Sequence, residues 1–434
     1  MKRLIILFLL ASVSCWGQNV HTLQDCLKEG LENNYSIKIQ KNKEAVSDNN
    51  ATLGNAGFLP TLDASARYNG SIDENTPLNQ TANAGVNLNW TIFEGFNVTS
   101  TYKKLKELQA QGELNTRIAI ENLVADIAAE YYNFIQQTIR LNNFRYAVEL
   151  SKERLRIVEQ RYRIGNFSGL DYQQAKVDFN SDSSAFMRQQ EALKSSAIVL
   201  NELLAREDLN TPVAVADSVI DVNSTLVLDD LMAAMLQDNA TLLYARRSGN
   251  IAELDYKITA SQSYPYLRLS AGSSYALHKG PDNLRGPLSA DYGLTLGINI
   301  FDGNNVRRAK RNARLNIENV QFELANTEQS LKADLYNIWQ AYQNNLQILG
   351  LEKENLVTAK LNHEIAMERY MLGDLSGIEM REAQKSLLDA EERLLAAKYN
   401  TKLCEISLLQ ISGRIQEYLQ VDFLHFQLAH MMQH

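Results

Sequence analysis

The sequence predicts a mainly α-helical chain with a smaller β part, in which one arrangement of helices and strands occurs twice. Three observations lead to this fold class. A set of motifs recurs at a nearly constant spacing, two long spans contain no proline, and two short segments alternate apolar and polar residues. Stacked solenoids usually need three or more repeats, so a single long duplication indicates two equivalent halves of one architecture.

Residues 1–17 have the layout of a secretory signal peptide, because Lys2 and Arg3 precede a short apolar run and small residues follow it. Two processing routes are open. The small residues favour cleavage after Gly17, and lipidation of Cys15 is the alternative. The apolar run is shorter than the ~20 residues that a spanning helix needs, and no later stretch reaches that length. We therefore expect an exported chain that is not an inner-membrane protein.

The net charge and the cysteine count exclude one class of partner and one class of fold. Removal of Lys2 and Arg3 takes the basic residues from 43 to 41, against 51 acidic residues, so the exported chain has a formal net charge of −10. An acidic chain is not expected to bind nucleic acid. The remaining cysteines, Cys26 and Cys404, allow one disulfide bond, which is too few for a disulfide-based fold.

The exported chain divides into a first structural repeat (18–225), a second structural repeat (226–413) and a C-terminal tail (414–434). Matching positions near the start of the repeats are 205 residues apart: Leu23 and Leu228, Asn34 and Asn239, Pro60 and Pro265. Later positions are 208 residues apart: Phe93-Glu94-Gly95 and Phe301-Asp302-Gly303, then Arg161-Tyr162-x-x-Gly165-x-x-Ser168-Gly169 and Arg369-Tyr370-x-x-Gly373-x-x-Ser376-Gly377.

Each repeat is predicted to contain a first helix and, after its strands, a long helix that returns as a shorter one. The long helices are predicted at 97–164 and 304–372, and the shorter ones at 168–205 and 376–412, in spans without proline. A helix over 97–164 would be roughly 100 Å long. Its apolar and aromatic residues recur every seven positions, which indicates a packing seam: Ile120, Ile127, Phe134, Leu141, Val148, Leu155 and Tyr162. Taken alone, such seams favour a coiled-coil scaffold.

The two alternating segments predict β-hairpins at 61–93 and 266–301. Strands of about ten residues with one apolar and one polar face match transmembrane barrel strands. Four strands cannot close a barrel, and an open edge in hydrocarbon leaves backbone groups unpaired, so other subunits must complete the sheet. A trimer would form a twelve-stranded barrel with an open interior, whereas a dimer would form an eight-stranded barrel whose interior is filled by side chains. The alternative, a soluble sandwich with one wet face, needs further strands.

Together these features resemble the TolC-like outer-membrane efflux family, the outer membrane factors of tripartite export systems. The resemblance runs from Leu23 to Gly413, and single motifs are less specific than their order, which occurs twice. The motifs that carry it are Leu23-x-x-Cys26-Leu27 with Asn33-Asn34, Phe58-Leu59-Pro60, Phe93-x-Gly95, both Tyr-x-x-Gly-x-x-Ser turns, and the helix starts Leu170-Asp171 with Ala175 and Ile378-Glu379 with Ala383-Gln384.

The resemblance implies a homotrimer with a twelve-stranded β-barrel in the outer membrane, in contact with its lipid, and a periplasmic α-helical tunnel of long helices. It further implies a passive exit channel of a tripartite efflux or type I secretion system, which a periplasmic adaptor protein couples to an inner-membrane pump of the RND or ABC type. The runner-up hypothesis is a non-transporting periplasmic coiled-coil scaffold protein.

The two turns between long and short helices are the first candidate site. They are Gly165-Asn166-Phe167-Ser168 and Gly373-Asp374-Leu375-Ser376. Each glycine is expected to end a helix in the left-handed conformation, and each serine is expected to cap the next helix. The resemblance implies a second role, contact with the hairpins of the adaptor.

Glu379 and Glu382 are the second candidate site, because they are three residues apart and therefore on one helical face. A solvated face is one interpretation. The resemblance implies another, in which three chains bring six carboxylates together at the closed periplasmic aperture, and such a ring would attract cations and respond to pH. Asp171 is the counterpart of Glu379 in the first repeat, and its position relative to the lumen stays open.

Basic residues begin both long helices, just after the predicted strands. Two interpretations are open: a plain solvated helix face, or contact with lipid phosphates at the periplasmic edge of the membrane. The residues are Lys103, Lys104 and Lys106 in the first repeat, and Arg307, Arg308, Lys310, Arg311 and Arg314 in the second.

No motif indicates catalysis, since the sequence has no P-loop, no GxSxG elbow and no Cys-x-x-Cys pair. No enzyme activity and no cofactor are therefore expected. The single arrangement with metal-ligand spacing is His430 and His434, close to His425, which would need a helical tail and lacks a third fixed ligand.

Overall fold

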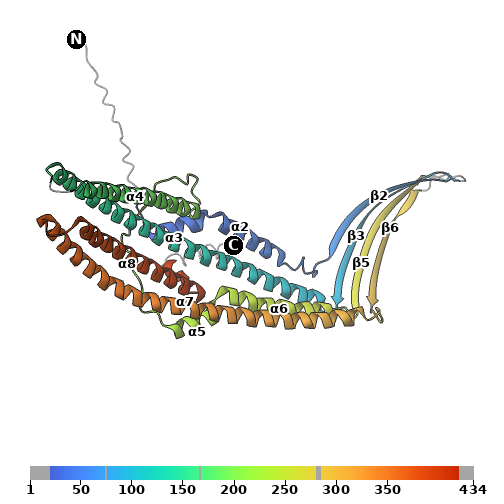
Figure 1. Ribbon diagram of the computed structural model, residues 1–434. Helices are drawn as coiled ribbons and strands as arrows, with labels where there is room; N and C mark the ends of the chain where they lie inside the picture. Colours follow the sequence, from blue (N-terminus) through green and yellow to red (C-terminus); the bar gives the residue numbers. More distant parts are fainter. Residues whose placement is uncertain (1–19, 74–75, 166–167, 280–284, 420–434) are drawn as a thin grey trace, which may run out of the picture.

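The computed structural model describes residues 20–73, 76–165, 168–279 and 285–419. The described chain is elongated, with a bundle of helices and a sheet that projects from one end of it (Figure 1). Several predicted features lie outside the described residues: the signal peptide with Cys15 and Gly17, Asn166 and Phe167 of the first turn, and His425, His430 and His434 of the tail.

The two repeats have the same order of elements, two helices, two strands and two helices. The first repeat contains α1 (Leu23–Asn33), α2 (Tyr35–Asn50), β2 (Thr61–Asp73), β3 (Thr76–Glu94), α3 (Asn97–Arg163) and α4 (Gly169–Leu203). The second contains α5 (Leu228–Asp238), α6 (Ala240–Ser261), β5 (Tyr266–Lys279), β6 (Arg285–Gly297), α7 (Asn305–Leu372) and α8 (Gly377–Ile411). The short strands β1 (Val20–His21) and β4 (Ala214–Val215) pair in parallel, and a 3₁₀ helix, η1 (Ile415–Leu419), follows α8.

The first helix of each repeat is divided in two, which the sequence interpretation did not anticipate. Asn34 and Asn239 leave the helical conformation, and each caps the following helix through its side-chain oxygen. Their side-chain amides reach across the molecule. Asn34 Nδ2 donates to the carbonyl of Leu203 at 3.1 Å, and Asn239 Nδ2 donates to the carbonyl of Ile411 at 2.9 Å. Thus α2 begins where α4 ends, and α6 begins where α8 ends.

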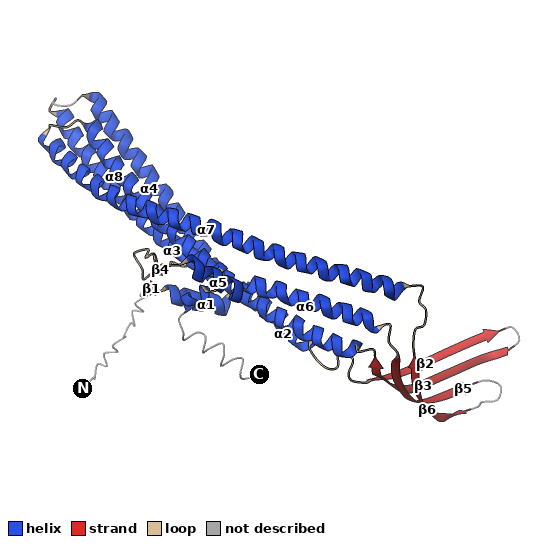
Figure 2. Cartoon of the chain, turned by 90° about the horizontal axis from the view of Figure 1, so that it is seen from below, coloured by secondary structure: helices blue, strands red, loops and turns tan. Residues whose placement is uncertain are grey.

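The long helices organise the bundle (Figure 2). α3 has 67 residues and α7 has 68, so each is about 100 Å long. α3 contacts α2 and α4 on one side and α6 and α8 on the other, and α7 contacts α6 and α8. Because α3 packs on two sides, its most buried positions near the hairpin end are Ala147, Ser151, Arg154 and Val158, whereas the predicted seam residues Leu155 and Tyr162 are only partly covered or exposed.

The four long strands form one antiparallel sheet in the order β2-β3-β5-β6, so β2 and β6 are its edges. β6 ends at Gly297, which pairs with Tyr266 at the start of β5. Ile298 and Ile300 therefore lie beyond the strand, although the alternation placed them in it. β5 cannot extend to pair with them, because Pro265 precedes it and has no N–H.

Both faces of the sheet are open. All residues of β2 from Thr61 to Ser71 are exposed, and neither Figure 1 nor Figure 2 shows a helix over either face. In the described part of the chain no second sheet packs on it, since the other sheet consists of β1 and β4 alone. The soluble-sandwich interpretation is therefore wrong for the described residues.

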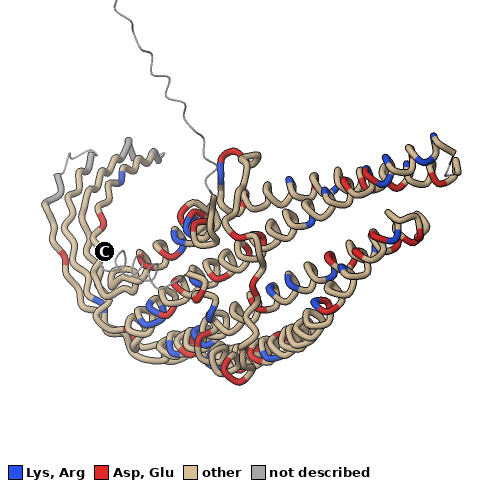
Figure 3. Tube along the Cα trace, turned by 90° about the vertical axis from the view of Figure 1, so that its left-hand side faces the viewer, with Lys and Arg blue, Asp and Glu red and all other residues tan. Residues whose placement is uncertain are grey.

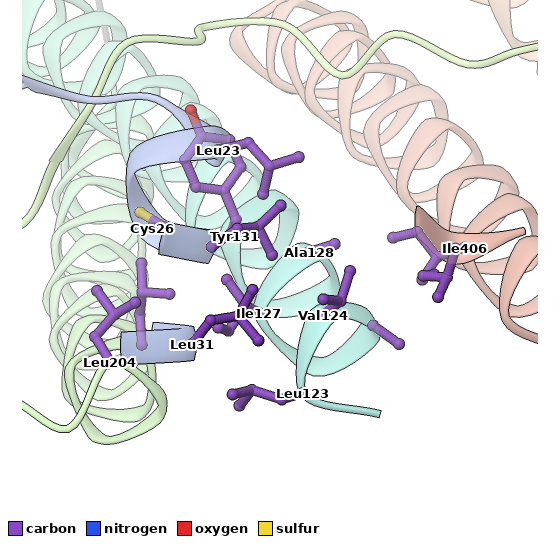
Figure 4. Close-up of a cluster of buried hydrophobic side chains, with 14 of the residues drawn as sticks. Leu23, Cys26, Leu31, Leu123, Val124, Ile127, Ala128, Tyr131, Leu204 and Ile406 are labelled. Carbon is purple, nitrogen blue, oxygen red and sulfur yellow. The ribbon is translucent and has the colours of Figure 1, made fainter. Parts of the chain in front are cut away.

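The core lies where the helices of the two repeats meet (Figure 4). Leu23, Cys26 and Leu31 of α1 pack against Ile127 and Tyr131 of α3, and the same cluster includes residues of α4, α8 and η1. A smaller cluster joins α5, α7 and α8. Cys26 and Cys404 are both free, so the single disulfide that the sequence allowed does not form.

Candidate functional site at the ends of the helical hairpins

Each long helix ends at a glycine and returns as the shorter helix. Gly165 has φ of 82° and Gly373 has φ of 86°. These values lie in the left-handed region, which a residue with a Cβ adopts only with strain. The amide of Gly165 donates to Tyr162 O at 3.0 Å, and that of Gly373 donates to Tyr370 O at 3.1 Å. The predicted role of both glycines in ending the helices is confirmed.

Serine begins both returning helices through a reciprocal pair of hydrogen bonds. Ser168 Oγ accepts from the amide of Asp171, and Ser376 Oγ accepts from the amide of Glu379, each at 3.2 Å. In return, Glu379 Oε2 accepts from the amide and the hydroxyl of Ser376 at 3.0 and 2.7 Å. Asp171 Oδ2 accepts from the same groups of Ser168 at 3.1 and 2.7 Å. The predicted caps are confirmed, and each is a complete capping box.

The capping boxes separate the three predicted acidic site residues into two kinds. The carboxylates of Asp171 and Glu379 turn back toward the serines. The hydrogen bonds from Ser376 hold the pKa of Glu379 below its usual value, with a smaller contribution from Arg369. Glu382 follows three residues later on α8, where its side chain is exposed.

Arg369 also contacts the second turn directly. Its Nη2 lies 3.2 Å from Asp374 Oδ2, in an ion pair whose side chains are 53% and 74% exposed. Leu375 packs against the small cluster of Tyr370 and Met380. One surface ion pair and one apolar contact therefore stabilise the second turn.

A buried ion pair joins the two hairpins and was not predicted. Arg381 of α8 donates from Nη1 to Asp182 Oδ2 at 2.7 Å and from Nη2 to Asp182 Oδ1 at 2.6 Å. Asp182 belongs to α4, and its side chain is 10% exposed. A forked guanidinium and carboxylate contact of this kind fixes both position and orientation.

Further contacts between the hairpins surround this pair. Arg140 of α3 donates to Glu392 of α8 at 2.7 Å, and the guanidinium of Arg161 lies 5.8 Å from the ring centre of Tyr370. Sequence reasoning missed all of them. One signal was available. Phe179 and Phe186 are seven residues apart, and Asp182 lies between them on the same apolar face of α4, where a buried charge needs a partner.

The other predicted sites are placed as follows. At the start of the long helices, Lys104 pairs with Asp255 at 2.6 Å, and Arg314 donates to the hydroxyl of Tyr256 at 3.0 Å. Within the described ranges no three His, Cys, Asp or Glu side chains gather as metal ligands. Of the helices that the structure describes, none is long and apolar enough to cross a membrane.

Comparison with known proteins agrees with this architecture. The profile of a family described as outer membrane efflux protein matches residues 26–206 and 231–414. The chain is 22% identical to the outer membrane protein TolC of Vibrio cholerae, over 97% of this chain and 98% of that protein. It is 19% identical to the outer membrane efflux protein BepC of Brucella suis, over 91% of this chain and 86% of that protein.

Solved structures share the fold. The CmeC outer membrane channel of Campylobacter jejuni superposes with a TM-score of 0.79 at 17% identity, covering 92% of this chain and 90% of that one. The outer membrane protein VceC of Vibrio cholerae superposes with a TM-score of 0.77 at 17% identity, covering 90% and 96%.

These matches confirm the resemblance, the mixed α and β fold and the outer-membrane location that the sequence predicted. Members of this family are channels rather than enzymes, and TolC-like channels are trimeric and work with adaptor and pump partners. The profile covers most of both repeats, including the turns and the helices around them. The chain therefore belongs to the outer membrane efflux protein family, and it is an outer-membrane efflux channel that extends into the periplasm.

Proposed function

We propose that three copies of this chain form a passive exit duct, which a periplasmic adaptor couples to an inner-membrane pump of the RND or ABC type. The observation that carries the proposal is the sheet, which has two open edges and two uncovered faces at one end of a very long helical bundle. Such a sheet is stable in hydrocarbon only if other copies pair with β2 and β6. Three copies supply twelve strands, enough for an open interior.

The helical part supports the same assembly. α2 and α7 are the outer helices of the layer nearest the sheet, because α2 contacts α3, α3 contacts α6, and α6 contacts α7. α7 exposes large apolar side chains along its length, including Phe322, Leu351, Val357 and Leu361. Neighbouring copies that cover this stripe would close the helices into a tunnel.

The ends of the hairpins are the proposed adaptor contact. Gly165, Ser168, Gly373 and Ser376 fix the two turns, and Asp374 and Leu375 are presented between them. Asn166 and Phe167, the other two residues proposed for this contact, lie outside the described residues. Of the proposed aperture residues, Glu382 is the one whose carboxylate is not used in a cap, so it is the strongest candidate for the lumen.

Two measurements test this function. The purified full-length chain should form trimers that conduct ions in planar lipid bilayers. A photo-cross-linking residue in place of Asp374 should capture the adaptor in intact cells, whereas the same residue in place of Asn312, at the opposite end of α7, should not. A monomer without conductance would contradict the channel and favour a scaffold, and conductance without adaptor capture would contradict the proposed contact alone.

A further inference from the structure

The start of α7 carries a run of basic residues without acidic partners. Arg307, Arg308, Lys310 and Arg311, called here the basic face of α7, lie within its first seven residues. At 100° per residue they span an arc of about 160°, which is one side of the helix. In the described parts of the chain none of the four forms an ion pair, and the first acidic residue of α7 is Glu318. Blue segments lie where the helices approach the sheet (Figure 3).

The opposite side of α7 faces the protein. Val306, Ala309 and Ala313 are half-buried, and α7 packs on α6 in this region. By contrast, Arg307, Arg308 and Arg311 are exposed. Lys310 is half-buried, and the three arginines lie on the surface that α6 leaves free.

Exposed apolar residues lead directly to this face. Leu294 and Leu296 of β6 are exposed, and so are Ile298, Ile300 and Phe301 in the segment that links β6 to α7. Ile300 is 91% exposed. An apolar surface followed within a few residues by a cluster of cations matches the order of hydrocarbon and phosphate at the edge of a bilayer.

A neighbouring copy of the chain is the competing occupant of this face. In a closed ring, the outer helix α7 would meet α2 of the next copy. Near the sheet α2 carries Glu44 and Asp48, and Lys38, Lys41 and Lys43 lie farther from the sheet. The lipid test below is therefore read together with the stability of the trimer.

We propose that the basic face of α7 binds the headgroups of anionic phospholipids in the periplasmic leaflet of the outer membrane. The inference rests on the proposed placement of the sheet in that membrane. Four guanidinium and ammonium groups per chain donate hydrogen bonds to lipid phosphates, and Ile298, Ile300 and Phe301 lie among the acyl chains. The contact fixes the depth of the sheet in the bilayer and the start of the tunnel.

The test compares lipid binding by the intact trimer. Full-length protein is incubated with equal amounts of phosphatidylglycerol and phosphatidylcholine, and the lipids that stay bound are counted by native mass spectrometry. The test variant combines Arg307→Gln, Arg308→Gln, Lys310→Gln and Arg311→Gln. The matched control combines Lys152→Gln, Lys176→Gln, Lys353→Gln and Lys385→Gln, which removes the same charge from exposed positions along the two hairpins.

The wild-type trimer and the control should retain phosphatidylglycerol over phosphatidylcholine by about threefold or more, and the test variant should lose most of this preference. Added salt should weaken the preference in the wild type, since it screens charges. An unchanged preference in the test variant would overturn the inference, as would an equal loss in the control. If trimers of the test variant dissociate but the lipid preference is unchanged, the basic face of α7 binds the neighbouring copy rather than lipid.

The same samples separate this inference from the channel proposal. Wild-type trimers that conduct ions but bind both lipids equally would overturn the lipid site alone. Wild-type protein that forms neither trimers nor conducting channels would overturn the proposed function.

Discussion

Arg381 of α8 and Asp182 of α4 form a two-pronged ion pair, with contacts of 2.7 and 2.6 Å, across 199 residues of sequence. The pair joins the two helical hairpins close to their free ends. Removal of either partner leaves a mostly buried charge without its counterpart, which costs roughly 3 kcal/mol in comparable sites. The contact therefore links α4 and α8, and we expect it to help fix the relative position of the two hairpins.

We expect Arg381→Gln to loosen the hairpins and raise the conductance of the channel. The charge reversal of both partners, Arg381→Asp with Asp182→Arg, should restore part of the wild-type conductance, because it restores the attraction. Arg369→Gln is the matched control. Its pair with Asp374 is exposed, and exposed pairs contribute about 0–1 kcal/mol. Equal conductance in Arg381→Gln and the control would show that the buried pair does not hold the hairpins.

Glu379 and Glu382 should behave differently when neutralised. Glu382→Gln should lower the preference of the channel for cations and weaken block by divalent cations, because its carboxylate is exposed. Glu379→Gln should change the selectivity less and weaken the start of α8 only slightly, since the Gln oxygen can still accept from Ser376 and only the charge is lost. Reversal potentials of single channels in a salt gradient measure the selectivity of both variants, and thermal unfolding measures their stability. Unchanged selectivity in Glu382→Gln would place this side chain away from the constriction.

His363 should make the α7 and α8 hairpin sensitive to acid. The side chain is 6% exposed, and its Nε2 has no hydrogen-bond partner in the described structure. Burial lowers the pKa of His363, and the adjacent Glu364 opposes this effect. The pKa of His363 is lower in the folded chain than the unfolded value of about 6.5. The free energy of unfolding is therefore unaffected by this group above pH 6.5, and it falls as the pH drops from 6.5 toward the folded pKa.

The free energy of unfolding falls by about 1.4 kcal/mol for each unit by which folding lowers the pKa of His363. Circular dichroism should therefore show a lower melting temperature at pH 5.5 than at pH 7.5. His363→Leu removes the titrating group and should reduce this difference. An identical acid effect in His363→Leu would assign the sensitivity to other groups.

Asn34 and Asn239 should each stabilise a junction between helices. Asn34→Ala removes the cap on α2 and the bond to Leu203, and we expect a loss of about 1–2 kcal/mol. Asn34→Asp keeps a capping oxygen and removes the amide donor, so it separates the two effects. Thermal unfolding of both variants provides the measurement. A melting temperature of Asn34→Ala equal to that of the wild type would contradict the role of this bond.

The sequence predicted the features that depend on local chemistry. The turns at Gly165 and Gly373 follow from the conformational freedom of glycine, and the strands follow from a period of two. The break at Asn34 was missed because part of its cause lies far away in the sequence. The side-chain amide of Asn34 donates to the carbonyl of Leu203, at the end of another helix. The pair of Arg381 and Asp182 was missed for the same reason, since no local pattern indicates which charges meet after folding.

We expect other copies of the chain to complete the open sheet. Within one sheet, β2 and β6 are about 14 Å apart, which is three strand spacings and too far for a disulfide bond. Cysteines at Ser65 of β2 and at alternate positions of β6 (Ser289, Asp291, Gly293 or Thr295) should therefore form disulfides only between copies, in a background without Cys26 and Cys404. Oxidation in the outer membrane should give covalent trimers at one register position. If folded protein in the membrane forms no cross-linked species at any of the four positions, other copies do not complete the sheet.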